Sequence, residues 1–158
     1  MKKSLNIAIG LENKILDKLT VLKNQYPEEM HWALMRASQE KLVELLNMAW
    51  LQPESFPEYP EIETSSIILP NERWQNVCTK INSYNTTGLL ETMSISNLHE
   101  KMSEFYSQSS SNIAHPLSKI FMQSMVELKT MQSMKVGMLA SSYQNKLWEE
   151  LGYAPFKG

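Results

Sequence analysis

The chain has 158 residues and a mass of 18.2 kDa, a length typical of one domain with a single hydrophobic core. Its 15 basic and 17 acidic residues nearly cancel, so no strong field attracts nucleic acid or an anionic membrane surface. The single cysteine, Cys78, excludes an intramolecular disulfide and a cysteine-based zinc or iron–sulfur site. In the N-terminal stretch MKKSLNIAIG, charged residues follow too soon for a signal peptide or a membrane span. We therefore expect a soluble protein of a reducing compartment, by default the cytoplasm, with neither nucleic acid nor membrane as partner.

Two helices are predicted in the first third of the chain. Apolar residues recur at intervals of three and four positions over residues 5–24, as expected for a helix with one buried face. A second helix is predicted from Pro27 to about Leu51, because proline suits the first helical position and Glu28 and Glu29 would complement the helix dipole. The short NQYP stretch between the two helices makes them neighbours in a hairpin.

A long connection follows, at about residues 52–87. It contains the proline-rich stretch FPEYPEIETSSIILP, which has no sustained period, and a short helix predicted at residues 71–84 with Asn71 as its cap. The apolar residues of this stretch either lie along a groove between helices, seal a dimer or bind a partner. They are Phe56, Tyr59, Ile62, Ile67, Ile68 and Leu69.

A second helical hairpin is predicted after the connection. One helix covers residues 88–108, and another begins at Pro116 and continues to about Glu150, where Gly152 and Pro155 end it. The residues expected inside this last helix are Leu117, Ile120, Phe121, Met125, Leu128, Met131, Val136 and Leu139. Two hairpins joined by a long crossover predict a single all-α domain over residues 1–158, a ferritin-like four-helix bundle with one short extra helix. A simple up-and-down bundle with an insertion is the alternative that periodicity leaves open.

Four segments also resemble a known family. LNIAIGLENKI followed by ASQEKLVELL, and HEKMSEFY followed by IFMQSMVELKTM, are similar to the two halves of the rubrerythrin-like branch of the ferritin-like superfamily. Each half of that family has a Glu on its first helix, a large residue, often Tyr, seven positions later, and a Glu-x-x-His on its second helix. The resemblance implies a di-iron centre with oxidoreductase or peroxidase activity. The six ligand positions correspond to Glu12, Gln39, Leu42, His99, Leu128 and Met131, and the two large-residue positions to Leu19 and Tyr106.

Only one of these six positions, Glu12, keeps the family's ligand. Leucine has no donor atom and methionine has only a soft thioether, so we expect no di-iron centre and no other bound cofactor. We expect Glu12 to face His99 across the bundle as a buried ion pair within reach of the Gln39 amide, because a lone buried carboxylate is costly. Leu42, Leu128 and Met131 would fill the remaining volume. The alternative is that the register is wrong by one turn and that Glu12 and His99 face solvent.

Other residues are assigned simpler roles. A stripe of methionines in the last helix suits core packing better than a soft-metal or haem site, and Cys78 is expected to be a packed thiol. His31 and His115 lie near helix starts and are expected at the surface. The stripe consists of Met122, Met125, Met131, Met134 and Met138.

Two functional hypotheses follow. The first is a non-catalytic scaffold that forms a homodimer or binds an unknown protein partner, with Trp50, Trp74 and Trp148 as anchors. The second is a metalloprotein with a remodelled centre that uses Glu12, His99 and either Gln39 or Glu127, and that acts in oxidative stress or metal handling.

Overall fold

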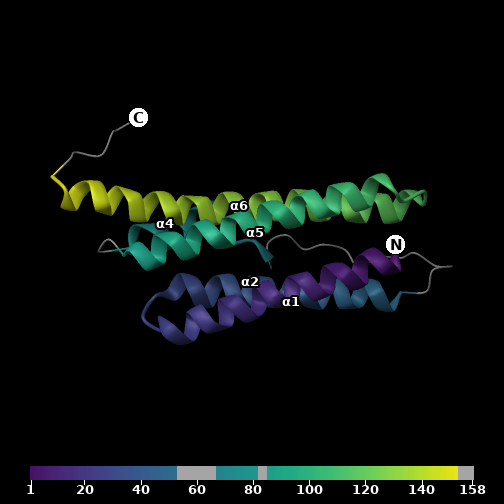
Figure 1. The fold of residues 1–158 in the computed structure, drawn as a ribbon, viewed down its shortest axis with the longest axis horizontal. Coiled ribbons are helices and arrows are strands. Elements are labelled where there is room, and N and C mark those ends of the chain that lie inside the picture. Colours follow the sequence, from purple (N-terminus) through teal and green to yellow (C-terminus); the bar gives the residue numbers. More distant parts are fainter. Residues whose placement is uncertain (53–66, 82–84, 153–158) are drawn as a thin grey trace.

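The chain folds into two layers of antiparallel helices. The structure is a computed structural model that describes residues 1–52, 67–81 and 85–152. Helices α1 (Lys2–Gln25) and α2 (Met30–Leu51) form one layer, α5 (Thr86–Ser111) and α6 (Pro116–Glu150) form the other, and the short α4 (Asn71–Thr79) lies beside α6 (Figure 1). The described residues contain no strand, which confirms the all-α prediction. Nowhere in these ranges does a helix have an apolar stretch that is long enough to cross the membrane.

Contacts between the layers define the directions of the helices. On α1 and α5, Glu12 contacts Tyr106 and Lys18 contacts Glu91, so these two helices are antiparallel. The contacts of α2 with α6 give the same relationship. It follows that α2 and α5 run in the same direction, and that the end of α2 and the start of α5 lie at opposite ends of the bundle (Figure 1).

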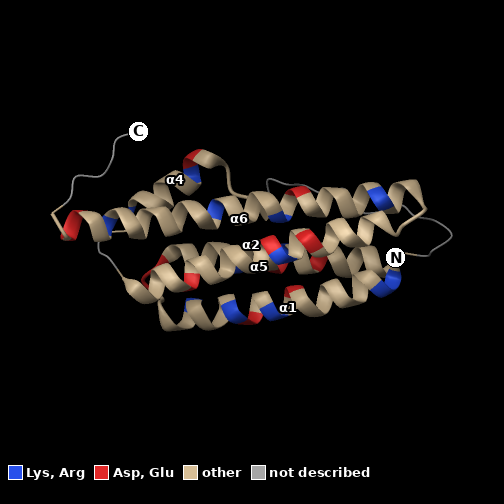
Figure 2. Cartoon of the chain, turned by 45° about the horizontal axis from the view of Figure 1, so that its top comes forward, with Lys and Arg blue, Asp and Glu red and all other residues tan. Residues whose placement is uncertain are grey.

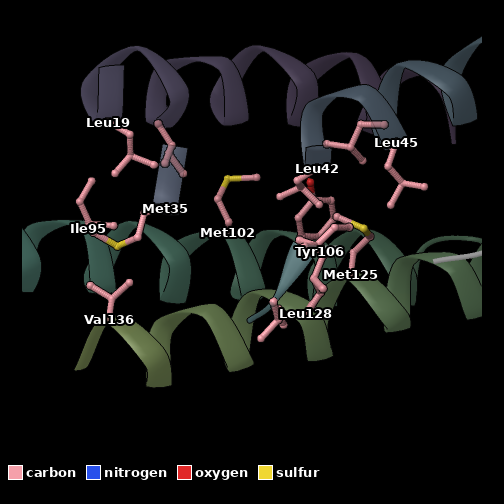
Figure 3. Close-up of a cluster of buried hydrophobic side chains, with 14 of the residues drawn as sticks. Leu19, Met35, Leu42, Leu45, Ile95, Met102, Tyr106, Met125, Leu128 and Val136 are labelled. Atoms are coloured by element: carbon pink, nitrogen blue, oxygen red, sulfur yellow. The ribbon is translucent and has the colours of Figure 1, made fainter. Parts of the chain in front are cut away.

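A continuous hydrophobic core lies between the two layers. Leu42, Tyr106, Met125 and Leu128 gather at one level of it, and each of them is at most 1% exposed (Figure 3). Burying one such side chain contributes about 1.5–3 kcal/mol relative to leaving it in water, so the layers are held together mainly by this interior. Charged residues of both signs are interspersed along the helices (Figure 2).

The structure corrects two predicted helix starts. Pro27 lies in the turn before α2, which begins at Met30 with Glu29 as its N-cap residue. Asn71 is the first residue of α4 rather than its cap, and its side chain accepts a hydrogen bond from Lys135. Near both helix starts a side chain contacts α6: Asn71 accepts from Lys135, and Glu29 accepts from the Tyr143 hydroxyl. Gly152, with a φ of 81°, follows the end of α6 as predicted.

The buried face of α6 differs from the predicted one. Leu117, Ile120, Met131 and Met134 are all more than 40% exposed, although they were expected to be inside. Most of the buried residues form two series that repeat every seven positions, as in a coiled coil. One series is Ser118, Met125, Gln132 and Leu139, and the other is Met122, Lys129, Val136 and Tyr143. Helix α6 has 35 residues, with apolar side chains on several sides. Its sequence alone therefore does not show which side is buried, because this depends on the helices that pack against it.

The connection packs partly on the bundle. Ile67 and Ile68 are buried and Leu69 is partly buried, as expected for a segment that lies along a groove, whereas Phe56, Tyr59, Ile62 and Pro155 lie outside the described residues. Trp74 of α4 is 3% exposed and donates to the Lys135 backbone carbonyl at 2.6 Å, so it is a core residue and not a surface anchor.

Candidate functional site

The centre of the bundle holds a buried carboxylate that residues from three other helices contact. Glu12 of α1 is completely buried. Lys129 of α6 lies 2.9 Å from its Oε2, the Gln39 amide of α2 donates to the same oxygen at 2.6 Å, and the Tyr106 hydroxyl of α5 donates to Oε1 at 3.1 Å. The Gln39 amide also donates to the Glu12 backbone carbonyl at 2.9 Å. Both carboxylate oxygens are therefore occupied by donors, which offsets the cost of removing the charge from water.

Lys129 is the partner that sequence reasoning missed. Its side chain is 0% exposed, and burial lowers its pKa while the Glu12 carboxylate acts in the opposite direction. No role was predicted for Lys129 from the sequence. The available signal was the seven-residue spacing, because Lys129 occupies the same position as Met122, Val136 and Tyr143.

His99 is buried as predicted, at 3% exposed, but the expected ion pair with Glu12 is wrong. Burial lowers the pKa of His99 well below its ordinary value, and the positive charge of Lys129 lowers it further, so the ring is neutral at pH 7. Its Nδ1 has no hydrogen-bond partner in the described part of the chain. A proton on the imidazole would place a second positive charge next to the Lys129 ammonium, so His99 stays neutral while Lys129 pairs with the acid.

The residues at the family's ligand positions do not fit a pair of iron ions. Leu42 and Leu128 are buried but have no donor atoms, and the prediction that Met131 fills the centre is wrong because it is 42% exposed. Glu127, the alternative acid, is exposed on α6. The remaining carboxylate, Glu12, is engaged by an ammonium. Among the described residues, no group of three or more His, Cys, Asp and Glu side chains is placed to hold a metal ion.

A second polar cluster lies at the end of the bundle where α2 begins. Glu29 Oε2 accepts from the Trp32 indole at 2.9 Å, from the Tyr143 hydroxyl at 2.9 Å and from His31 Nε2 at 3.1 Å. His31 is 4% exposed, so its predicted surface position is wrong. Desolvation lowers its pKa to about 4, against the opposing effect of Glu29. Gly88 of α5 lies against the Tyr143 ring, since a Cβ at this position would be 2.7 Å from Tyr143 Cζ.

This second cluster borders a surface pocket of about 280 Å³. Residues of α2, α4 and α6 line it, together with Lys80, Ile81 and Asn85. Its charged groups are Glu28, Glu29 and Lys80, and Oε2 of Glu29 is already occupied by the three donors. The cluster thus joins the α1–α2 turn to α6.

The two clusters give the molecule a buried ion pair at its centre and a hydrogen-bonded carboxylate at one end. Neither contains a nucleophile activated by a base. The Tyr106 and Tyr143 hydroxyls both have pKa values raised by burial and by the carboxylate they contact, so both remain protonated at neutral pH. No family model, curated protein or solved structure matches this chain.

Proposed function

We propose that this chain is a non-catalytic ferritin-like bundle in which a buried ion pair takes the place of the di-iron centre, and that it acts as a scaffold in a homodimer or with a protein partner. The single observation that carries the proposal is the contact of Lys129 Nζ with Glu12 Oε2 at 2.9 Å. Glu12 is the only carboxylate among the six positions that correspond to the family's ligands. The Lys129 ammonium next to it supplies the positive charge that a metal ion would otherwise bring.

The course of the chain supports the ferritin-like part of the proposal. Because α2 and α5 run in the same direction, the connection between them starts at one end of the bundle and finishes at the other. In a simple up-and-down bundle with an insertion, the second and third long helices would run in opposite directions, and the connection would start and finish at the same end of the bundle.

Two exposed tryptophans support the proposed role as a scaffold for a homodimer or a protein partner. Trp50 near the end of α2 is 41% exposed and Trp148 near the end of α6 is 49% exposed, and they lie at opposite ends of the bundle. Tryptophan is enriched at protein interfaces, where its large apolar ring and its indole N–H both find contacts. We expect self-association that Trp148→Ala weakens and that Leu90→Ala, at another exposed position on α5, leaves unchanged, as measured by sedimentation velocity over a range of concentrations.

Metal analysis tests whether the centre of the bundle binds metal ions. Protein purified without chelator should contain far less than one metal ion per chain, and added Fe(II), Mn(II) or Cu(I) should not raise its melting temperature. Glu12→Gln serves as the matched variant. Stoichiometric metal that raises the melting temperature in the wild type, and is lost in Glu12→Gln, would establish the remodelled metal centre instead.

A further inference from the structure

The outward face of α6 is apolar and carries almost no charge. From Leu117 to Trp148, alternating steps of three and four residues mark ten positions on the side of the helix that faces away from the core. Glu127 is the only charged residue among the ten, although an exposed helix face is normally rich in charges. We call these ten positions the α6 stripe. Its apolar members are Leu117, Ile120, Met131, Met134, Met138 and Trp148.

The α6 stripe is exposed along most of its length. Apart from Met138, which is partly buried, its apolar side chains are all more than 40% exposed. The neighbouring helices contact α6 on either side of the stripe, α5 through Thr130 and Ser133, and α4 at the Lys135 backbone. Among the described residues, no helix covers the stripe itself. A contiguous apolar surface of this length is uncommon on a monomer and is typical of an interface.

The dimensions of the α6 stripe suit a second copy of the same helix. With a rise of 1.5 Å per residue, the stripe is about 46 Å long. Its alternating steps of three and four residues are those of a coiled-coil seam, which packs against another long helix with the same spacing. Helix α6, with 35 residues, has both the length and the spacing. Two such stripes, each about 10 Å wide, bury on the order of 1,000 Å² in total, which is at the lower limit for a specific interface.

The charges on α6 favour an antiparallel arrangement of the two copies. In a parallel pair, Glu127 of each copy would face Glu127 of the other inside the seam, and like charges in contact are costly. An antiparallel pair has its twofold axis between Met131 and Met134, and in it Glu127 is level with Met138 of the second copy. Lys135 of the second copy then lies less than one helical turn from Glu127, at the edge of the stripe. The two carboxylates are thus separated, and each has an ammonium within reach.

We propose that two copies of this chain associate through their α6 stripes as an antiparallel pair, with Met131 and Met134 of both copies next to the twofold axis. This inference rests on the proposed scaffold role and deepens it, because it assigns the surface through which the homodimer forms. The association is weak, since an interface of this small area corresponds to a dissociation constant of about 1–100 μM. Trp148 lies at the end of the same stripe, so its substitution removes a peripheral contact.

A charge at the centre of the α6 stripe tests whether this surface is the interface. Met134→Glu places a carboxylate from each copy next to the twofold axis and should raise the dissociation constant about tenfold or more, measured by sedimentation velocity over a range of concentrations. Met134→Leu keeps an apolar side chain at this position and should have little effect. Val21→Glu, at a 53% exposed position of α1, adds the same charge outside the stripe and should leave the dissociation constant unchanged.

Disulfide formation tests the orientation of the two copies. Ile120 and Asn145 are equally far from the proposed twofold axis, so they face each other between antiparallel copies. In a Cys78→Ala background under mild oxidation, a mixture of Ile120→Cys and Asn145→Cys protein should form a disulfide-linked dimer. Either variant alone should not, because its two identical positions lie as far apart in the dimer as Ile120 and Asn145 do along α6, about 37 Å.

The outcomes distinguish this interface from the proposed function. Self-association that Met134→Glu leaves unchanged overturns the α6 stripe as the interface, but not the homodimer of the proposed function. A disulfide-linked dimer of Ile120→Cys protein alone overturns the antiparallel orientation. A wild type that stays monomeric at about 1 mM overturns both the stripe and the homodimer, and leaves a different protein as the partner of the scaffold.

Discussion

Lys129 and Glu12 are 117 positions apart in the chain, yet they form an ion pair in which neither side chain has any exposed surface. The ion pair connects α1, the first helix, with α6, the last. Gln39 and Tyr106 complete the set of donors, so each of the four long helices contributes one residue. Such a cluster defines the relative rotation of the helices, because a slip of one residue in any of them would leave a buried polar group unpaired.

Removing the ammonium should be strongly destabilising. Lys129→Met leaves the Glu12 carboxylate buried without a counter-charge, and we expect a loss of about 3–5 kcal/mol in the free energy of unfolding, measured by urea denaturation. The double variant Glu12→Leu with Lys129→Met should recover most of this loss, because no unpaired charge remains.

The control for this experiment is Lys101→Met. Lys101 and Glu104 form an ion pair at 3.0 Å, but their side chains are 64% and 59% exposed. Exposed pairs of this kind contribute about 0–1 kcal/mol. Equal losses for Lys101→Met and Lys129→Met would contradict the role of the buried pair.

Stability should fall when the pH drops below neutrality. In the native state His31 takes up a proton only near pH 4, because burial lowers its pKa, whereas in the unfolded chain it does so near pH 6.5. Between these values the unfolded chain binds more protons, so the free energy of unfolding decreases from about pH 6.5 down to pH 4, by up to about 3 kcal/mol from His31. His99, whose pKa is also lowered, acts in the same direction.

Chemical denaturation at pH 7.5 and pH 4.5 measures this effect. His31→Gln should reduce the pH dependence, and His115→Gln, at the exposed residue before α6, should not change it. A pH dependence that is unaffected by His31→Gln would show that this histidine is not held in its neutral form.

Two glycine substitutions should have opposite effects. In Gly88→Ala the new Cβ would approach Tyr143 Cζ to 2.7 Å, so the ring must shift and its hydrogen bond to Glu29 is strained. We expect a loss of about 1–3 kcal/mol. Gly137→Ala, in the interior of α6 with nothing within 4 Å of the new Cβ, should instead stabilise the protein by about 0.5–1 kcal/mol. Thermal unfolding of the two variants makes the comparison, and a Gly88→Ala variant as stable as the wild type would argue against the packing of Tyr143 on Gly88.

Cys78 should react slowly with thiol reagents in the native protein. Its side chain is buried on α4, and burial raises its pKa, which reduces the thiolate fraction. We expect the rate of reaction with a disulfide reagent at pH 8 to follow the opening of α4 from the bundle and to increase steeply with urea. Immediate reaction in the absence of denaturant would place α4 away from the core.

Much of the helical architecture is predictable because it depends on local patterns. Helix α6 begins at Pro116 and ends before Gly152, as predicted. Apolar residues at intervals of three and four positions locate α1, α2, α5 and α6 to within a few residues. The burial of Glu12 and Gln39 was also predicted, from their spacing among apolar residues, and that of His99 from the resemblance to the family's ligand positions. The predicted starts at Pro27 and Asn71 were wrong, and in the structure Glu29 and Asn71, the residues at these two helix starts, both contact α6.

The sequence by itself determined that this chain is helical, where the long helices lie, and that a carboxylate is buried among them, since these properties follow from the period of apolar residues and from turn residues. Only the tertiary structure decided that Lys129 rather than His99 pairs with Glu12, that Met131 faces outward, and that His31 is buried. The reason is that the rotation of a helix about its axis depends on what packs against it. When several faces carry apolar residues, that choice is made by contacts between residues far apart in the chain.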